Sequence, residues 1–393
     1  MTSSEDLQWA EAQDAKEPSL RAQFLFPPDH PLYFAGHSLG LQPRRAREYV
    51  LQELDDWARL GVEGHFSGRN PWIRYHELLA QPLADLVGAR PREVVAMNSL
   101  SVNLHLLMVS FYRPTQARHR ILIEKGAFPS DQYAVASQAR FHGYDGGVVH
   151  SDDLLRDLDD SIALVLIGQP NYLTGQAFDL PALIEKGHAH GCVVGVDLAH
   201  GAGNLVLQLH EWGADFAAWC NYKYLNGGPG STGAVFIHER HLGHALPRFE
   251  GWWGHDKATR FEMGPVFKPI DSAEAWQLSN PPVLQLAALR ASLELFPPMA
   301  EVRARGDRLT GYLERLLRKL PSVEILTPAS PGSRGSMLTV RVRGDARALV
   351  RKLHDRGALV DLRNPDIIRI APSPLYGSYA DISRLCGLIS ELA

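Results

Sequence analysis

Lys223 is the residue of this 393-residue chain whose position most suggests chemistry. It lies between two tyrosines, after the apolar run 215–219 and before the paired glycines at 227–228. Loss of water favours the neutral form of an amine, and only the neutral amine attacks a carbonyl carbon. The position therefore favours a lysine that forms a Schiff base. Taken alone, a lysine whose ammonium group reaches solvent from a strand end is the more common case.

A second chemical group follows another apolar run. Asp197 comes directly after residues 193–196, and His200 follows three residues later. A carboxylate at such a strand end can hold a protonated ring nitrogen or a metal, or it can simply cap a helix while His200 makes a loop hydrogen bond. Asp197 and Lys223 together match the two groups that a pyridoxal phosphate site needs, an acidic partner for the pyridine nitrogen and a lysine for the aldehyde.

Two other patterns have weaker support. Residues 228–233 satisfy G-x-G-x-x-G, but a dinucleotide fingerprint opens a helix, whereas this one leads into the apolar run 234–237. The closely spaced histidines at 188, 190, 241 and 244 lack the helical spacing and the neighbouring glutamate or cysteines of a zinc site. We therefore predict neither a dinucleotide site nor a metal site.

A buried sheet must position these groups. Seven short apolar runs without polar alternation predict strands buried on both faces of a mostly parallel sheet. Ligands bind beyond the carboxyl ends of such strands, which is where Asp197 and Lys223 lie. Helical periodicity predicts two helices before the sheet, over 43–60 and 72–87, the second ended by Gly88. The predicted strands cover residues 94–96, 121–123, 147–149, 162–167, 192–196, 215–219 and 234–237.

From about residue 281 the pattern changes to one of helices followed by alternating strands and helices, which predicts a smaller α/β domain. We expect residues 1–60 to pack with this small domain, residues 61–290 to form the large cofactor-binding domain, and residues 291–393 to form the small one. The predicted helices cover 283–295, 300–320, 346–356 and 379–392, and the predicted strands cover 323–326, 337–342 and 367–371.

Composition excludes several classes of protein. Lys plus Arg is 40 and Asp plus Glu is 44, a formal charge of -4 that lacks the positive surplus of nucleic-acid and polybasic membrane binders. Three cysteines are too few for a disulfide framework. The N-terminus is acidic, and the longest apolar run, 162–167, is too short to span a membrane. We therefore expect a cytoplasmic protein without nucleic-acid or membrane partners.

Several motifs, in order between residues 33 and 380, resemble those of the kynureninases, pyridoxal-phosphate enzymes of the aspartate-aminotransferase fold group. This implies an α/β fold of type I, with a large, mostly parallel sheet domain and a smaller α/β domain. Two positions depart from the family pattern: His37 stands where asparagine is usual, and Ser101 where threonine is frequent. The motifs are YFAGHSLGLQP (33–43), MNSLSVNLH (97–105), FPSD (128–131), DLAH (197–200), YKYLN (222–226), GWWGH (251–255), SNPP (279–282) and RIAP (369–372).

The resemblance also implies a role for each residue of these motifs. Lys223 would bind pyridoxal 5'-phosphate and move the α-proton, Asp197 would pair with the pyridine nitrogen, and Tyr222 would add its hydroxyl. Arg369 would fork onto the substrate carboxylate, a task that suits a guanidinium. The other residues implied to contact the cofactor are Leu100, Ser101, Phe128, Pro129, Ser130, Asp131, Gly168, His200, Trp252 and Asn280, and those implied to face the aromatic end of the substrate are His65, Ser279 and Asn280.

The implied reaction is hydrolysis of L-kynurenine, or its 3-hydroxy form, to L-alanine and anthranilate or 3-hydroxyanthranilate, a step of tryptophan degradation and NAD-related metabolism. The polar groups at the aromatic end favour tolerance of the 3-hydroxyl. The resemblance further implies a homodimer, with Trp252 and Asn280 reaching in from the second subunit.

The alternatives are a cysteine desulfurase-like lyase, an aminotransferase, and a non-catalytic binding protein of the same fold. The cysteines lie in buried patterns, which disfavours the desulfurase. A silent binding protein would be expected to lose Lys223 or Arg369, and both are present.

Overall fold

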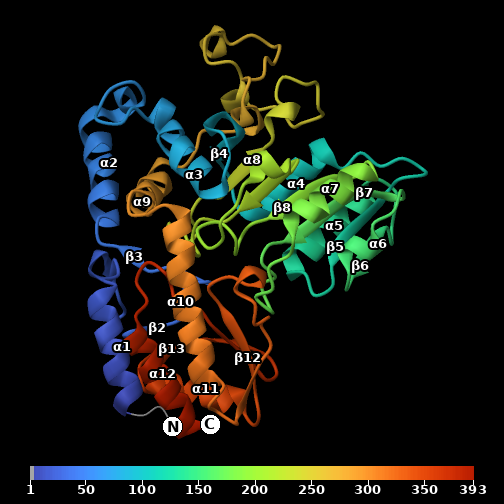
Figure 1. Ribbon diagram of the computed structural model, residues 1–393. Helices are drawn as coiled ribbons and strands as arrows, with labels where there is room; N and C mark the ends of the chain where they lie inside the picture. Colours follow the sequence, from blue (N-terminus) through green and yellow to red (C-terminus); the bar gives the residue numbers. More distant parts are fainter. Residues whose placement is uncertain (1–3) are drawn as a thin grey trace.

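The larger part of the molecule is built on a seven-stranded sheet (Figure 1). The computed structural model describes residues 4–393. The strand order is β4-β10-β9-β8-β7-β5-β6, and all neighbours pair in parallel except β10, which is antiparallel to β4 and β9. The predicted mostly parallel sheet is confirmed. The strands are β4 (Val94–Ala96), β5 (Arg120–Glu124), β6 (Val148–Ser151), β7 (Ile162–Gly168), β8 (Val193–Asp197), β9 (Phe216–Trp219) and β10 (Ala234–Ile237).

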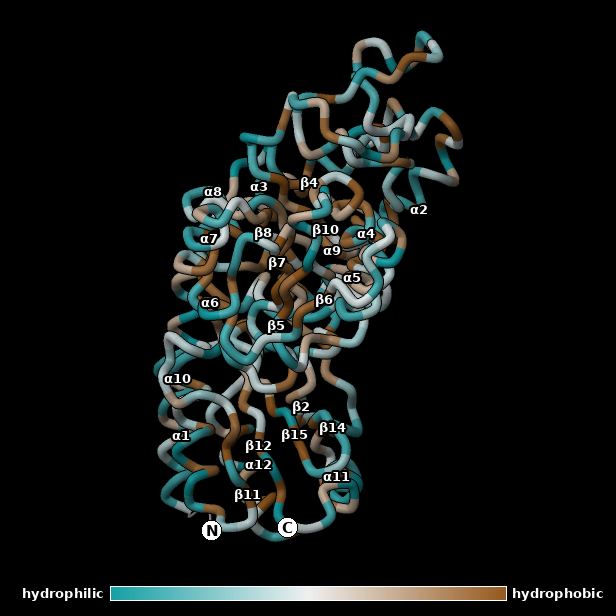
Figure 2. Tube along the Cα trace, turned by 90° about the vertical axis from the view of Figure 1, so that its right-hand side faces the viewer, coloured by the Kyte–Doolittle hydropathy of each residue, from teal (hydrophilic) through white to brown (hydrophobic). Residues whose placement is uncertain are grey.

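Helices cover both faces of this sheet, which is why its strands are apolar throughout. Along β7, Val165 and Ile167 belong to the core on one face, while Leu164 and Leu166 belong to the core on the other. Figure 2 shows the same strands as the brown interior of the molecule. One face is covered by α2 (Ala46–Leu60), α3 (Ala80–Val87), α7 (Leu180–Ala189) and α9 (Val283–Leu293), and the other by α4 (Leu100–Phe111) and α5 (Pro129–Phe141), while α6 (Leu154–Asp157) and α8 (Leu209–Trp212) are short.

The two helices expected before the sheet are shorter than predicted. The chain makes 3-10 turns over Trp72–Leu79 before α3 begins at Ala80. Pro82 explains the break, because its missing N–H is tolerated only in the first turn of a helix. Gly88 ends α3 with a φ of 62°, as predicted.

The smaller part of the molecule has an antiparallel sheet in the order β11-β12-β15-β14. Its core lies between that sheet and the helices drawn at the bottom of Figure 1. Strand β14 was not predicted. The elements are α10 (Met299–Leu317), β11 (Val323–Ile325), β12 (Leu338–Val342), α11 (Ala346–Asp355), β13 (Ala358–Leu359), β14 (Asp361–Arg363), β15 (Ile367–Ile370) and α12 (Tyr379–Leu392).

The N-terminal segment joins the two parts. Helix α1 (Ser4–Lys16) packs on α12, where the amide of Tyr379 donates to Asp14 Oδ1 at 2.8 Å. Strand β2 (Leu32–Tyr33) pairs in parallel with β13, and β1 (Phe24–Leu25) pairs with β3 (Gln42–Pro43). Helix α2 packs instead on α9 of the larger part. The domain limits at residues 60 and 290 stay a prediction.

Two chain-wide findings complete the fold. The three cysteines are free and buried. Within residues 4–393, none of the helices combines the length and the apolarity needed to cross a membrane.

Candidate active site

One cavity of about 320 Å³ lies where the strands of the large sheet end. Glu124, Gly168 and Asp197 are the last residues of β5, β7 and β8, and all three line it. The small sheet closes the cavity through Arg363 of β14 and Arg369 of β15. The remaining lining residues are His37, Ser38, Ser99, Leu100, Ser101, Phe128, Ser130, Asp131, Pro170, Tyr172, Ala199, His200, Cys220, Tyr222, Lys223 and Ser231.

Lys223 reaches this cavity from the loop between β9 and β10. Its Nζ lies 3.2 Å from His200 Nε2 and 5.8 Å from the ring centroid of Phe128. The turn at Gly40 braces the loop, since the Gly40 amide donates to the Tyr222 carbonyl at 2.8 Å. A Cβ at Gly40 would lie 2.4 Å from the Lys223 carbonyl oxygen, so only glycine permits this approach.

The imidazole beside the lysine is neutral. Burial first, and the positive charge of Lys223 second, hold the pKa of His200 well below its ordinary value. In the tautomer that is protonated at Nδ1, the neutral ring offers a lone pair at Nε2 to Lys223 Nζ. His200 can therefore orient Lys223 without competing for positive charge.

Three buried carboxyl groups meet on the floor of the cavity. Burial raises the pKa of Asp197, although Lys223 and the Ala199 amide, which donates to its Oδ1 at 2.7 Å, oppose the shift. Burial and then the charge of Asp197 raise the pKa of Asp131 well above its ordinary value. Burial raises the pKa of Glu124 to about 8. The charge of Lys223 opposes the shifts of Asp131 and Asp197, and a bound positive charge would relieve the repulsion further.

The donor groups present fit pyridoxal 5'-phosphate. One oxygen of Asp131 is buried without a hydrogen bond, as expected of a group that awaits a ligand. At the other end of the cavity, α4 begins after Ser99, whose side chain makes no capping bond, so the first amides of the helix stay open to a phosphate. Ser101 Oγ lies 2.6 Å from Ser130 Oγ at the same end. A lysine, an acid and an anion site thus share one cavity.

Arg369 is held with one edge of its guanidinium free. Its Nε donates to Asp361 Oδ1 at 3.0 Å, its Nη2 pairs with Asp361 Oδ2 at 3.0 Å, and its Nη1 donates to the Tyr172 carbonyl at 2.7 Å. These contacts use three of the five N–H groups. One N–H on each terminal nitrogen remains, which is the arrangement that binds a carboxylate with two hydrogen bonds.

The cavity brings together most of the residues expected in the site, but not all. Pro129, the first residue of α5, does not line it. Four others also do not line it, and they belong to segments 61–66 and 251–280, here called the lobe, which are drawn in blue and gold in the upper part of Figure 1. They are His65, Trp252, Ser279 and Asn280.

Aromatic contacts tie this lobe together. Phe66, next to His65, lies 5.9 Å from the ring of Phe261, which lies 5.5 Å from Trp252. The Trp253 amide donates to the Leu278 carbonyl at 3.5 Å, next to Ser279. These contacts join the segments that carry the four residues, none of which lines the cavity with Lys223.

Sequence reasoning missed several residues of the site, among them Glu124, Tyr172 and Arg363 of the cavity wall and Asp361, which holds Arg369. Glu124 follows the apolar run 121–123 directly, which is the signal that identified Asp197. Asp361 and Arg363 alternate with Val360 and Leu362, the period of a half-buried strand. No comparable signal marks Tyr172.

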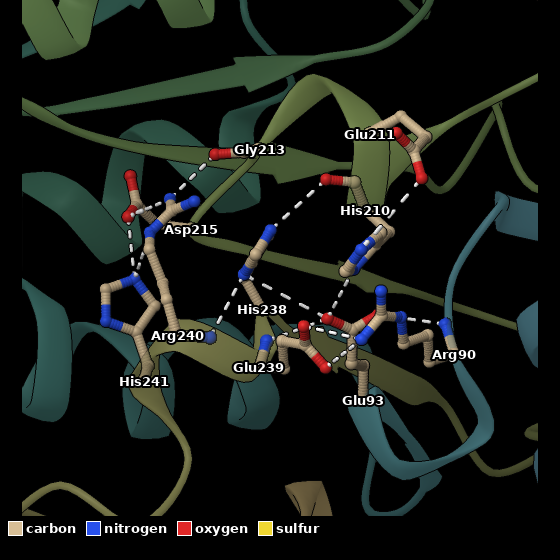
Figure 3. A network of polar contacts seen from close by, with 10 residues as sticks. All are labelled: Arg90, Glu93, His210, Glu211, Gly213, Asp215, His238, Glu239, Arg240 and His241. Atoms are coloured by element: carbon tan, nitrogen blue, oxygen red, sulfur yellow. Dashed lines mark hydrogen bonds and ion pairs between the residues drawn. The ribbon is translucent and has the colours of Figure 1, made fainter.

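None of the closely spaced histidines lines the cavity, and His241 contacts Asp215 outside it (Figure 3). His188 Nε2 and His241 Nε2 lie 2.9 and 2.7 Å from the buried carboxylate of Asp215, and Arg240 Nη2 lies 2.5 Å from it. Burial alone would raise the pKa of Asp215, but His188, His241 and Arg240 together hold it well below its ordinary value. Asp215 therefore joins α7, β9 and the turn after β10.

Replacing Asp215 with asparagine is expected to lower the free energy of unfolding by about 2–4 kcal/mol at pH 7, because His188, His241, Arg240 and the Val194 amide lose a buried anion. Because the pKa of Asp215 is lower in the folded protein than its ordinary value of 3.8, its ionised carboxylate stabilises the fold at pH values above 3.8. This stabilisation decreases as the pH falls below 3.8. Urea unfolding should show a smaller difference in the free energy of unfolding between Asp215→Asn and wild type at pH 3.5 than at pH 7. Asp160→Asn, an exposed aspartate 2.8 Å from His190, serves as the matched control and should change little.

Glu93, His210 and His238 form a cluster whose atoms are close enough for a metal, but their hydrogen bonds argue for a structural role. Glu93 Oε1 accepts from the Glu239 amide and contacts His210 Nδ1, while His238 Nδ1 accepts from the Arg240 amide (Figure 3). The two imidazole rings stack at an interplanar angle of 13°, so their in-plane lone pairs do not converge on one point.

Comparison with known proteins gives consistent matches along the chain. A family model described as the kynureninase C-terminal domain matches residues 302–389. A kynureninase of Myxococcus xanthus is 58% identical over 400 residues, covering 95% of this chain and 93% of that protein. One of Koribacter versatilis is 54% identical over 398 residues, covering 94% of each.

Solved structures show the fold at lower identity. A mutant of C-DES, with glycine covalently linked to its PLP cofactor, aligns with a TM-score of 0.80 at 20% identity, over 95% of this chain and 99% of that one. The cysteine desulfurase CsdA of Escherichia coli aligns with a TM-score of 0.78 at 19% identity, over 95% and 97%. These neighbours share the type I fold.

Proposed function

Because this chain belongs to the kynureninase family, we propose that its cavity hydrolyses L-kynurenine, its 3-hydroxy form or both, to L-alanine and anthranilate or 3-hydroxyanthranilate. The protein is a pyridoxal-phosphate enzyme. One observation carries the proposal: Lys223 of the β9–β10 loop, Asp197 of β8 and Arg369 of β15 line the same cavity.

Each of these residues has a task that its surroundings support. When bound, pyridoxal 5'-phosphate supplies an electron sink for negative charge at the substrate α-carbon. Lys223 Nζ would hold the cofactor and then take the α-proton, with His200 as its neighbour at 3.2 Å. Asp197 would keep a proton on the pyridine nitrogen. The open edge of Arg369 would bind the substrate carboxylate, and Tyr222 of the cavity wall would add a hydroxyl donor.

The reaction is tested by supplying the purified chain with pyridoxal 5'-phosphate and L-kynurenine, then measuring anthranilate fluorescence and L-alanine. Equal amounts of the two products are expected. Release of sulfur from cysteine, or conversion of the cofactor to pyridoxamine phosphate by an amino acid, would contradict the proposal. A parallel assay with 3-hydroxykynurenine tests the expected tolerance of the 3-hydroxyl.

A cysteine desulfurase is not supported by the site. Cys220 lines the cavity, but it is buried, and burial raises the pKa of its thiol. A desulfurase needs an accessible cysteine that readily forms a thiolate. The cysteine of this cavity is therefore structural in our interpretation.

Replacing Asp361 with asparagine is expected to raise the KM for kynurenine about tenfold with kcat within about threefold, because Arg369 loses the anion that orients it. Steady-state kinetics measure both constants. Asp366→Asn is the matched control, since Asp366 also pairs with an arginine of the small sheet, Arg341 at 3.2 Å, but lies outside the cavity. A fall in kcat with no change in KM would contradict this role for Asp361.

A homodimer would complete the site. The lobe that holds His65, Trp252, Ser279 and Asn280 exposes large apolar side chains, and contiguous apolar surface is typical of protein interfaces. A second copy placed there could bring these four residues to the cavity of its partner. Analytical ultracentrifugation should find a dimer, and charged substitutions in the lobe should dissociate it. The exposed apolar residues are Val62, Phe66, Trp252, Phe261, Met263 and Val266.

The proposed location is the cytoplasm, where the enzyme would take part in tryptophan degradation. The three free thiols support it, because a reducing compartment keeps cysteines unpaired.

A further inference from the structure

His37 is a residue of the cavity wall to which the proposed reaction assigns no task. Its side chain is fully buried, at 0% exposure, and it lines the same cavity as Lys223. Neither ring nitrogen makes a hydrogen bond within the described part of the chain, although the Phe34 carbonyl is near enough to act on its pKa. A buried imidazole without partners is unfavourable for the fold alone, which points to a partner that binds later.

The backbone fixes where this imidazole lies. Ala35 bridges to Ala371, two residues beyond Arg369, and the Ser38 amide closes a turn on the Ala35 carbonyl at 2.9 Å. The same turn then reaches the lysine loop through Gly40. His37 therefore stands between the strand that carries Arg369 and the loop that carries Lys223.

The charges around His37 show what it can bind. Burial lowers its pKa most, and the positive charges of Arg369, Lys223 and Arg363 lower it further, in that order. Its ring centroid lies 6.2 Å from that of His200. The ring is thus a neutral group in a positive environment, and each neutral imidazole has one N–H to donate. An anion at Arg369 is the natural acceptor.

We propose that His37 completes the substrate carboxylate site, donating one ring N–H to the α-carboxylate that Arg369 binds. This inference rests on the proposed function, because it takes an amino acid as the substrate. Asparagine, the usual residue of the family at this position, also carries an N–H donor, so the two side chains share this capacity. His37 acts as a binding residue and moves no proton.

The two products of the reaction, used as inhibitors, distinguish a contact with the substrate carboxylate from a contact with its aromatic ring. L-Alanine carries the carboxylate without the aromatic ring, and anthranilate carries the ring without the amino-acid carboxylate. The holoenzyme of His37→Leu should bind L-alanine about tenfold more weakly as a competitive inhibitor, the loss of about one hydrogen bond to a charged group. Its inhibition by anthranilate should stay within about twofold of wild type. The KM for kynurenine should rise together with the inhibition constant of L-alanine.

If His37→Leu does not fold, two variants with side chains of equal size, His37→Asn and His37→Asp, test the same role. His37→Asn keeps a donor and should lose less affinity for L-alanine than His37→Asp, which offers a negative charge to the carboxylate. His105→Leu is the control, since His105 lies on α4 outside the cavity and contacts Gln138 at 3.1 Å. It should not change either inhibition constant.

Three results would overturn the inference: unchanged L-alanine inhibition in His37→Leu, an equal loss for anthranilate, or loss of cofactor absorbance in His37→Asn. The two inhibition readouts are measured against kynurenine turnover by the wild-type enzyme, whereas the cofactor absorbance of His37→Asn is read without any turnover. A wild-type enzyme that does not hydrolyse kynurenine would instead contradict the proposed function, and that assay is independent of His37.

Discussion

Replacing Lys223 with alanine is expected to lower kcat for kynurenine by at least about a thousandfold. The reason is structural: Lys223 Nζ is the amine on the cavity wall within 3.2 Å of a neutral histidine and over the Phe128 ring. The variant should also lose the visible absorbance of covalently held cofactor. Steady-state kinetics and an absorbance spectrum of the purified protein give both readouts.

The matched control for this variant is Lys125→Ala. Lys125 follows β5 directly, as Lys223 follows β9 at a short distance, but it lies on the surface, 3.0 Å from Asp152. It should keep both activity and absorbance. Full turnover by Lys223→Ala, or an unchanged spectrum, would remove Lys223 from the reaction and leave the cavity without its nucleophile.

The strands that present Asp197 and Lys223 could be predicted because both faces of the sheet are buried. Such strands read as short apolar runs, and the observed β4 and β10 coincide with the runs predicted at 94–96 and 234–237. The polar residue that ends a run then lies at the carboxyl edge of the sheet, whatever the details of the fold. This local rule identified Asp197 and, applied evenly, would also have identified Glu124.

The arginine site could be predicted only in part. Arg369 lies within a predicted strand, but Asp361 lies in a three-residue strand at the edge of the small sheet, where half-buried residues give a weak pattern. Its contact with Arg369 joins residues of neighbouring strands, and strand order is not readable from one sequence. The edge strand was therefore missed, and with it the anion that orients the guanidinium.

His37 shows a different limit. The sequence marks it as a departure from a family pattern, but the departure alone does not say whether the ring faces solvent, core or ligand. The bridge between Ala35 and Ala371 and the contact of Gly40 with the lysine loop decide this, and both are tertiary contacts. The same holds for the residues of the exposed lobe, because the spacing of residues in one sequence does not reveal a contact between two subunits.

Replacing Asp197 with asparagine is expected to lower kcat at least about a hundredfold while cofactor still binds. An asparagine keeps the size of the side chain but cannot balance a protonated ring nitrogen. Asp131 and Glu124 are close, yet burial raises the pKa of both, to about 8 for Glu124, so near neutral pH they are poor substitutes. Kinetics together with cofactor absorbance separate this loss from a loss of binding.

The neighbouring carboxyl groups make the pH dependence of this variant informative. The charge of Asp197 contributes to the raised pKa of Asp131, so removing it should allow Asp131 to ionise more readily. The residual activity of Asp197→Asn should then rise with pH, and the double variant Asp131→Asn with Asp197→Asn should not show this rise. Asp131→Asn alone should lower kcat less than Asp197→Asn does. If it costs more, the partner of the ring nitrogen is Asp131, and Asp197 acts by raising the pKa of that neighbour.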